Sequence, residues 1–274
     1  MARRPPDLAL HQEPGVFTQR TPRVVAARRL QRRRDRDATG RFLAEGPQAV
    51  REALRASRVR ELFATGAAFE RYPELTRDAT PVTEDALASL AGTVQPQGLV
   101  AVCEAADVPL DRAVARTPRL TAVLAEIRDP GNAGTVLRTA DAAGAAAVVF
   151  AGDAVDPYNG KCVRASAGSL FHVDVVRERD PHAVVAALRG AGVRILAATG
   201  YGDADLDDLA DAGELAAPTA WLFGSEAHGL PDDLLAAADR RVRVPIHGAA
   251  ESLNLAAAAA VCLYSSARAQ RSSR

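Results

Sequence analysis

From residue 119 onward, continuous apolar runs alternate with segments in which apolar residues recur every three or four positions. The continuous runs predict buried strands at 120–127, 145–150, 193–199, 219–223 and 240–246. The segments between them predict helices at 134–144, 183–192, 231–238 and 253–269. Near-continuous apolar strands that alternate with helices indicate a parallel sheet covered on both faces. Residues 119–270 are therefore expected to form one α/β domain.

The first part of the chain has a shorter and more mixed pattern. It predicts a helix within 42–57 after Phe42 and Leu43, strands at 59–65 and 98–104, and a helix at 83–92. Residues 23–104 are thus expected to form a smaller N-terminal α/β domain. Residues 1–22 contain four prolines without periodicity and are expected to be a flexible tail. Residues 105–118 are polar with two prolines, which predicts a linker.

Composition narrows the class of protein. Hydrophobic residues make up 48% and charged residues 25%, which is ordinary for a globular protein. No apolar run is long enough to span a bilayer, so no membrane partner is expected. Three widely spaced cysteines argue against a disulfide framework and a zinc site, and the five histidines show no metal-ligand spacing. No metal site is expected, and the reducing cytoplasm is the expected location.

The net charge of zero hides a strong asymmetry. Residues 1–60 hold 15 Arg and 6 acidic residues, a net charge of +9 that the rest of the chain balances. A basic end on an otherwise acidic chain suits a polyanionic partner such as RNA, although a solvated Arg-rich helix would look similar. The predicted RNA-binding residues are Arg32, Arg33, Arg34 and Arg41, with Lys161 and Arg164 further along the chain.

Three loops that follow predicted strands carry polar side chains. The first contains Asn132 and leads to Arg138 one turn into the next helix, and the second contains Glu226 between Gly224 and Gly229. The third, 244–254, ends with Ser252, which is expected to cap the last helix, and Asn254. Each feature alone has an ordinary structural explanation. Because ligands bind beyond the carboxyl ends of parallel strands, their coincidence at one edge predicts a functional site.

The same three loops resemble, in order, the signature motifs of the SpoU/TrmH branch of the SPOUT RNA methyltransferases. The matching stretches are DPGNAGTVLRTADAAG, LFGSEAHGL and VPIHGAAESLNLAAAA. The stretch VDPYNGKCVRASAGSLFHV, residues 155–173, resembles the segment between the first two motifs in the ribosomal RNA enzymes of that branch. The basic segment 23–104 is similar to the N-terminal substrate-binding domain of the family. Three ordered motifs together are far more specific than any one of them.

This resemblance implies transfer of a methyl group from S-adenosyl-L-methionine to a ribose 2′-hydroxyl, with 23S ribosomal RNA as the favoured substrate. It also implies a C-terminal trefoil knot and a homodimer with the active site at its interface. The implied catalytic residues are Asn132, Arg138, Glu226, Ser252 and Asn254, with Glu226 orienting Arg138 or groups of the partner subunit. The implied cofactor-binding residues are Thr199, Gly200, Leu222, Phe223, Gly224, Val244, Ile246 and Leu253.

The identity of the base is open at this point. The family is often described with the arginine that matches Arg138 as the base, but an arginine side chain is effectively always protonated. A permanent guanidinium would more naturally hold a phosphate or stabilise the alkoxide that forms from the ribose hydroxyl. Glu226 and Ser252 are the other candidates for proton transfer. Arg138 is expected to be essential, whatever its role.

Other functions fit the sequence less well. A transfer RNA 2′-O-methyltransferase and a non-catalytic RNA-binding protein are the main alternatives. A dinucleotide-binding oxidoreductase is disfavoured because the GNAG stretch lacks the Gly-x-Gly pair that makes the phosphate turn. A serine hydrolase is disfavoured because Ser166 has Gly168 after it but no glycine two residues before it.

Overall fold

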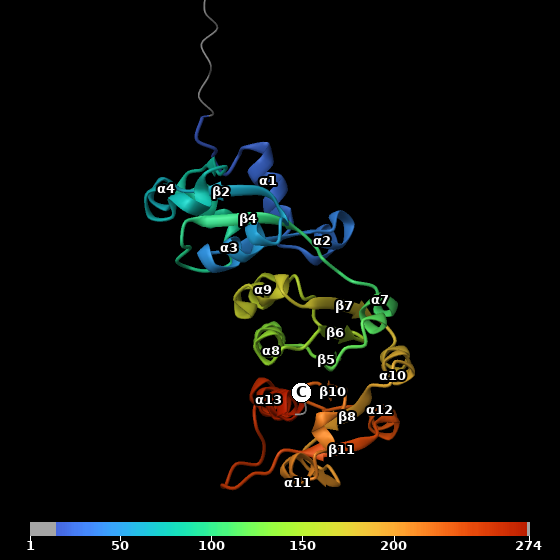
Figure 1. The fold of residues 1–274 in the computed structure, drawn as a ribbon. Helices are drawn as coiled ribbons and strands as arrows, with labels where there is room; N and C mark the ends of the chain where they lie inside the picture. Colours follow the sequence, from blue (N-terminus) through green and yellow to red (C-terminus); the bar gives the residue numbers. More distant parts are fainter. Residues whose placement is uncertain (1–14, 273–274) are drawn as a thin grey trace, which may run out of the picture.

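The computed structural model describes residues 15–272, which form two α/β domains stacked one above the other (Figure 1). The N-terminal domain has a four-stranded sheet in the order β1-β4-β2-β3. β4 runs antiparallel to β1 and β2, while β2 and β3 are parallel. The strands are β1 (Arg41–Glu45), β2 (Val59–Ala64), β3 (Thr80–Pro81) and β4 (Leu99–Glu104).

Helices lie on both faces of this sheet. α1 and α6 supply the apolar side chains that pack on one face, and α3 and α4 supply those on the other. The helices are α1 (Pro22–Arg29), α2 (Arg33–Thr39), α3 (Pro47–Arg55), α4 (Gly66–Arg71), α5 (Pro73–Thr76) and α6 (Glu84–Leu90). The sequence pattern did not indicate α1 and α2, because both are rich in arginine and contribute few buried side chains.

The C-terminal domain contains a seven-stranded sheet in the order β7-β6-β5-β10-β8-β11-β9. Every pair of neighbouring strands is parallel, which confirms the predicted parallel sheet. The strands are β5 (Leu120–Ala125), β6 (Ala147–Ala151), β7 (Asp174–Glu178), β8 (Arg194–Ala198), β9 (Ala204–Asp205), β10 (Thr219–Phe223) and β11 (Arg240–Arg243).

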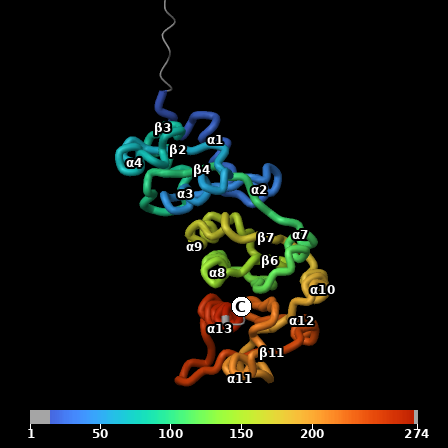
Figure 2. The backbone as a smooth tube through the Cα atoms, in the orientation of Figure 1, coloured from blue at the N-terminus to red at the C-terminus, as the bar shows by residue number. Residues whose placement is uncertain are grey.

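Helices lie on both faces of the seven-stranded sheet, as Figure 2 shows along the chain. α8, α9, α11 and α13 lie on one face, and α7, α10 and α12 on the other. Their bounds are α7 (Leu110–Ala115), α8 (Pro130–Ala143), α9 (Gly160–Ser166), α10 (Pro181–Gly190), α11 (Leu206–Asp211), α12 (Asp232–Ala237) and α13 (Leu255–Ser272). After β11 the segment 244–254 leads into α13, which packs against α8. The trefoil knot implied for this region stays a prediction.

Two segments predicted to lack structure are ordered instead. Residues 1–14 of the predicted tail lie outside the described residues, but Phe17 forms a bridge with Val82 and packs against the core of the N-terminal domain. In the predicted linker 105–118, Asp107 forms a bridge with Val175, and Leu110–Ala115 form α7. This helix forms because Ala113 is buried against the face of the sheet that α10 covers, so only part of the segment is a simple connection.

The hydrophobic core continues from one domain into the other. One cluster of buried side chains includes Phe42 of the N-terminal sheet and Tyr158 and Leu170 of the C-terminal domain. Deeper in the C-terminal domain, the indole N–H of Trp221 donates to the hydroxyl of Ser266 at 2.9 Å, and both residues are fully buried. The three cysteines are also buried and unpaired.

Candidate active site

The turn after β10 is shaped by an unusually close backbone approach at Gly224. A Cβ atom on Gly224 would lie 2.1 Å from the carbonyl carbon of Gly229 and 2.3 Å from the backbone nitrogen of Leu230. Only glycine allows the chain to fold back this tightly. Ser225 and Gly229 then exchange two backbone hydrogen bonds of 3.0 and 2.9 Å, and Gly229 has a φ of +70°. Glu226 is therefore held at the tip of a closed turn.

A second part of the site begins at the N-terminus of α8. Asp129 caps this helix by accepting from the backbone N–H groups of Gly131 and Asn132, and Pro130 occupies the first turn. The pKa of the Asp129 carboxyl is lowered by the N–H of Asn132, by Lys161 and by the N–H of Gly131. Asp129 was not among the predicted site residues, although an Asp followed by Pro at the start of a helix is a recognisable capping signal. This cap fixes the position of Asn132.

Three predicted catalytic residues form one chain of hydrogen bonds. The amide nitrogen of Asn254 donates to Oδ1 of Asn132 at 3.2 Å, and Nδ2 of Asn132 donates to Oε1 of Glu226 at 3.0 Å. Glu226 also accepts from the backbone N–H of Arg128 at 3.4 Å. The three residues come from three loops that are far apart in sequence. The structure thus brings Asn132, Glu226 and Asn254 together, as the sequence predicted.

Ser252 does not cap the last helix, which corrects that prediction. The cap is Asn254, whose Oδ1 accepts from the backbone N–H of Ala256 at 2.9 Å. Ser252 is exposed and lies three residues before α13 begins at Leu255. The helix therefore starts later than predicted. The side-chain oxygen of Asn254 accepts the capping hydrogen bond, and its side-chain nitrogen donates to Asn132. One amide therefore sets both the start of α13 and the orientation of Asn132.

Arg138 lies apart from this chain of hydrogen bonds. Its side chain is exposed on α8 and makes no hydrogen bond or ion pair with any residue in the range 15–272. Glu226 does not orient Arg138 within this chain, because both of its oxygens are directed to Asn132 and Arg128. The alternative role for Glu226, in orienting groups of a partner subunit, stays a prediction.

A cleft of about 660 Å³ opens beside the hydrogen-bonded chain. It is bounded by the end of β5, the start of α8 and the turn after β10. Its lining residues include Glu126, Arg128, Asn132, Glu226 and His228. No sequence pattern indicated Glu126, which has a φ of +56°, a backbone conformation that residues other than glycine rarely adopt. The cleft is large enough to admit a nucleotide, and it combines the polar groups of these residues with apolar surface.

The predicted cofactor-binding residues lie at the end of β10 and in the segments that follow β8, β10 and β11. β8, β10 and β11 lie close together in the sheet, so the loops after them converge. The side chains of Leu222 and Phe223 are buried on opposite faces of the sheet, which leaves only their backbone groups for a ligand. Val244 is half-buried, while Ile246 and Leu253 are 38% and 39% exposed.

The loop after β8 forms the other edge of this region. The backbone N–H of Thr199 donates to the carbonyl of Val242 at 2.9 Å, and Gly200 is exposed. A Cβ atom on Gly202 would lie 2.6 Å from the backbone nitrogen of Arg243. Gly202 was not among the predicted site residues, although its lack of a side chain lets the loop lie directly on β11.

The predicted RNA-binding arginines occupy different environments. Arg32, Arg33, Arg34 and Arg41 are all exposed on or beside α2. Arg33 and Arg34 lie 3.6 and 3.7 Å from Asp37 and Asp35 of the same helix. Lys161 and Arg164 pair with other parts of the chain, with Asp129 at 3.0 Å and Glu45 at 3.2 Å. Arg164 therefore links the two domains and is less available for a phosphate than expected. No cluster of residues that could bind a metal ion occurs within the described range, and none of its helices is long and apolar enough to cross a membrane.

Comparisons with known proteins agree with this architecture. The sequence profile of the SpoU rRNA methylase family matches residues 119–264, and that of the MRM3-like substrate binding domain matches residues 21–101. The chain is 34% identical over 253 residues to the 23S rRNA (guanosine(2553)-2′-O)-methyltransferase RlmP of Bacillus subtilis, covering 91% of this chain and 97% of that protein.

A second relative comes from Streptomyces viridochromogenes. Its 23S rRNA (uridine(2479)-2′-O)-methyltransferase is 38% identical over 184 residues, covering 65% of this chain and 63% of the relative. The solved structure of the SpoU methyltransferase AviRb from that organism, in complex with the cofactor AdoMet, superimposes with a TM-score of 0.80 at 33% identity. The superposition covers 93% of this chain and 100% of AviRb.

Proposed function

Because the chain belongs to the SpoU rRNA methylase family, we propose that it transfers a methyl group from S-adenosyl-L-methionine to a ribose 2′-hydroxyl of 23S ribosomal RNA. The observation that carries the proposal is the hydrogen-bonded chain of Asn132, Glu226 and Asn254, which three separate motifs build at one sheet edge. The Bacillus subtilis relative acts on a guanosine of 23S rRNA, and the Streptomyces viridochromogenes relative acts on a uridine. The cytoplasm is the proposed location, because that substrate is found there.

The loops after β8, β10 and β11 fit S-adenosyl-L-methionine. Gly224 and Gly202 remove side-chain bulk where backbone groups come close together. Ile246 and Leu253 leave apolar surface partly exposed, which suits an adenine ring. Thr199, Gly200, Leu222, Phe223 and Val244 complete the proposed binding region. When bound there, the cofactor supplies an electron-poor methyl group for attack by the ribose oxygen.

The side chains of the site have distinct proposed roles. A ribose hydroxyl is a poor nucleophile while it keeps its proton, so a nearby acceptor is required. Glu226 is better placed for this role than Ser252, because a carboxylate is an acceptor and its orientation is fixed by Asn132. The guanidinium of Arg138 keeps its positive charge and stabilises the oxygen as it loses the proton. Asn254 orients Asn132 and so acts on the reaction indirectly.

A homodimer is the proposed assembly. On α13, Val261 and Tyr264 are 40% and 48% exposed and lie three residues apart, so they share one face of the helix. An apolar face on the helix that packs against α8 supports a second copy of the chain as the occupant. Such a partner would lie near Arg138, which has no partner within the described part of its own chain. Measurement of the solution mass, with Tyr264→Arg as the disrupting variant, tests this part of the proposal.

Transfer of labelled methyl groups to purified 23S ribosomal RNA and to transfer RNA tests the proposed function. We expect labelling of the 23S RNA by the wild-type protein and loss of labelling in Arg138→Ala. Arg112→Ala is a matched control, because Arg112 is also exposed but lies on α7, on the opposite face of the sheet. Labelling of transfer RNA alone would favour the transfer RNA enzyme instead. Binding of RNA without binding of the cofactor would favour the non-catalytic RNA-binding protein.

A further inference from the structure

The segment 155–173, between β6 and β7, forms the surface on which the N-terminal domain rests. Two aromatic rings of this segment pack on Phe42 in β1. The ring centroids of Tyr158 and Phe171 lie 4.6 and 6.0 Å from the ring centroid of Phe42. These aromatic side chains belong to the hydrophobic core that runs through both domains. The proposed methyl transfer assigns no role to this segment, although it is one of the most distinctive stretches of the sequence.

A buried ion pair anchors the contact. Arg36 of α2 and Asp156 are only 6% and 4% exposed, and two guanidinium nitrogens lie 2.7 Å from Oδ2 of Asp156. The remaining nitrogen of Arg36 donates to the carbonyl oxygens of Leu30 and Gln31 at 2.9 and 3.0 Å. All three nitrogens of the guanidinium are therefore satisfied. Removal of one partner from such a buried pair leaves an uncompensated charge and is strongly destabilising.

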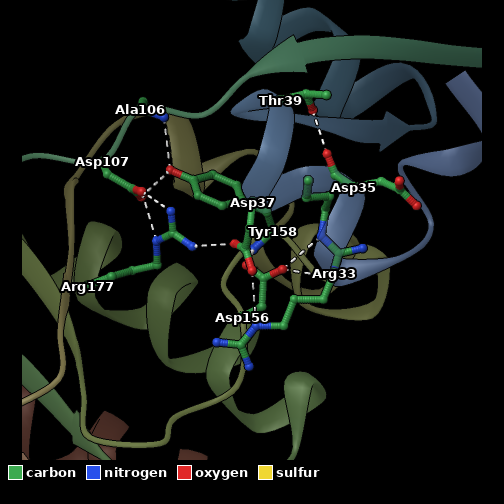
Figure 3. A network of polar contacts seen from close by, with 10 residues as sticks. Arg33, Asp35, Asp37, Thr39, Ala106, Asp107, Asp156, Tyr158 and Arg177 are labelled. Atoms are coloured by element: carbon green, nitrogen blue, oxygen red, sulfur yellow. Dashed lines mark hydrogen bonds and ion pairs between the residues drawn. The ribbon is translucent and has the colours of Figure 1, made fainter. Parts of the chain in front are cut away.

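A second set of polar contacts surrounds this pair (Figure 3). Arg177 of β7 forms ion pairs with Asp107 and, at 3.1 Å, with Asp37 of α2. The hydroxyl of Tyr158 donates to Asp107 at 2.8 Å, and the guanidinium of Arg177 lies over the ring of Tyr158. Both domains and the connection between them thus converge on one network of charges.

Two further contacts join the segment 155–173 to the N-terminal domain outside this network. Arg164 of α9 pairs with Glu45 at the end of β1, at 3.2 Å. His172 lies 3.2 Å from Glu52 of α3, whose side chain is 8% exposed. The N-terminal domain is therefore held through α2, β1 and α3 together. Contacts at three separate elements oppose rotation about any single one of them.

The opposite side of the same segment packs on the helix that carries Asn132. A Cβ atom on Gly134 of α8 would lie 2.4 Å from the carbonyl oxygen of Cys162 and 2.6 Å from the Cβ of Ala165, so α8 and α9 are in very close contact. Lys161 pairs with Asp129, the cap of α8. The N-terminal domain and the hydrogen-bonded chain at the active site are thus attached to the two sides of one short segment.

We infer that the segment 155–173, anchored by the Arg36–Asp156 pair, fixes the distance and orientation between the RNA-binding surface of the N-terminal domain and the reacting ribose. This inference rests on the proposed function. The protein then selects its target by the spacing between two parts of a folded RNA, one held at the exposed arginines of α2 and the other at the cleft. Arg36 and Asp156 are positioning residues that act through the domain arrangement, without contact to the ribose.

The test compares two RNA substrates, both methylated in the wild-type assay. One is full-length 23S ribosomal RNA, and the other is a short fragment that contains only the mapped target nucleotide and its hairpin. Asp156→Ala should lower kcat/KM on the full-length RNA by roughly ten- to a hundredfold, as expected for a misplaced reactive group. Its kcat/KM on the fragment and its affinity for S-adenosyl-L-methionine should change little. Its small-angle X-ray scattering profile should show a broader range of domain arrangements than that of the wild type.

Two further variants separate orientation from folding. The double variant Arg36→Met/Asp156→Asn removes both charges of the pair, and the amide oxygen at position 156 can still accept from the buried backbone N–H of Tyr158, as Oδ1 of Asp156 does at 2.9 Å. It should therefore recover the scattering profile and most of the activity on the full-length RNA. Arg60→Ala is the matched control, because it removes an exposed ion pair with Glu104 inside the N-terminal domain. It should behave as the wild type on both RNAs.

The outcomes distinguish this inference from the proposed function. Equal losses on the two RNAs, or an unchanged scattering profile in Asp156→Ala, would overturn the inference and leave the methyltransferase proposal intact. If the wild-type protein labels no RNA, the proposed function and selection by spacing both fail. Scattering alone then decides whether Arg36 and Asp156 hold the two domains in one arrangement.

Discussion

Replacement of Gly224 by alanine tests how the turn after β10 supports the site. The new Cβ would lie 2.1 to 2.3 Å from three backbone atoms of Gly229 and Leu230, whereas real Cβ atoms do not approach other heavy atoms within 3.0 Å. The turn must therefore move by about 0.9 Å, and no flexible side chain can absorb the shift. Overpacking of this kind costs about 1–3 kcal/mol of folding free energy. In a chain of this size, each kcal/mol lowers the melting temperature by about 2–4 °C.

Gly224→Ala should also lower the rate of methyl transfer. The displaced turn carries Glu226, whose hydrogen bond to Asn132 is 3.0 Å long in the native site. A misplacement of about 1 Å can lower the rate of an enzyme by about 100-fold. Thermal unfolding and methyl transfer are measured side by side, with Gly190→Ala as the control, because a Cβ there meets no atom within 4 Å. A Gly224→Ala protein that melts and methylates like the wild type would refute this account of the turn.

Three other predictions each concern a single residue outside this turn. Glu126→Gly should raise the free energy of unfolding by about 1 kcal/mol in urea titrations, because glycine tolerates the φ of +56°; an unchanged midpoint would contradict this. The pKa of His172 is raised above 6.5, first by its hydrogen bond to Asp141, so the charged ring stabilises the fold fully below about pH 6.5 and ceases to do so as pH rises through the folded value. His172→Gln should therefore be less stable than the wild type at mildly acidic pH and equal to it at alkaline pH, whereas a constant difference across pH would argue against the charged ring. Trp221→Phe should lose about 1–3 kcal/mol because it leaves the buried hydroxyl of Ser266 without its donor, and the added change Ser266→Ala should recover part of that loss in the same unfolding assay.

Much of the C-terminal domain is predictable because its strands are buried on both faces. β5, β6, β8 and β10 are continuous apolar runs, and all were expected within a few residues of their observed bounds. The pattern did not indicate β7, an edge strand whose sequence DVVRE has only two buried residues. The convergence of Asn132, Glu226 and Asn254 was predictable as well, because parallel strands end at one edge.

Other features depend on contacts that no local pattern encodes. Arg36 lies in an arginine-rich stretch and looks solvent-exposed, but its partner Asp156 is 120 residues away in sequence. The difference between Ser252 and Asn254 as the helix cap depends on where the chain turns into α13 after the segment 244–254. Glu126 has no sequence signal at all, because its unusual backbone angle arises from the way β5 leads into the cap of α8. Long-range pairing and loop geometry therefore explain why the sequence pattern did not predict these features.

The burial of all three cysteines makes the chain well suited to site-specific labelling. Burial raises the pKa of the Cys103 and Cys262 thiols to about 12 and also raises the pKa of Cys162. The thiolate is the reactive form, so the native side chains should react slowly with maleimide dyes at neutral pH. A cysteine introduced at an exposed position of each domain would then be modified selectively without removal of the native ones. Fluorescence energy transfer between two such dyes could follow the distance between the domains while the protein binds RNA.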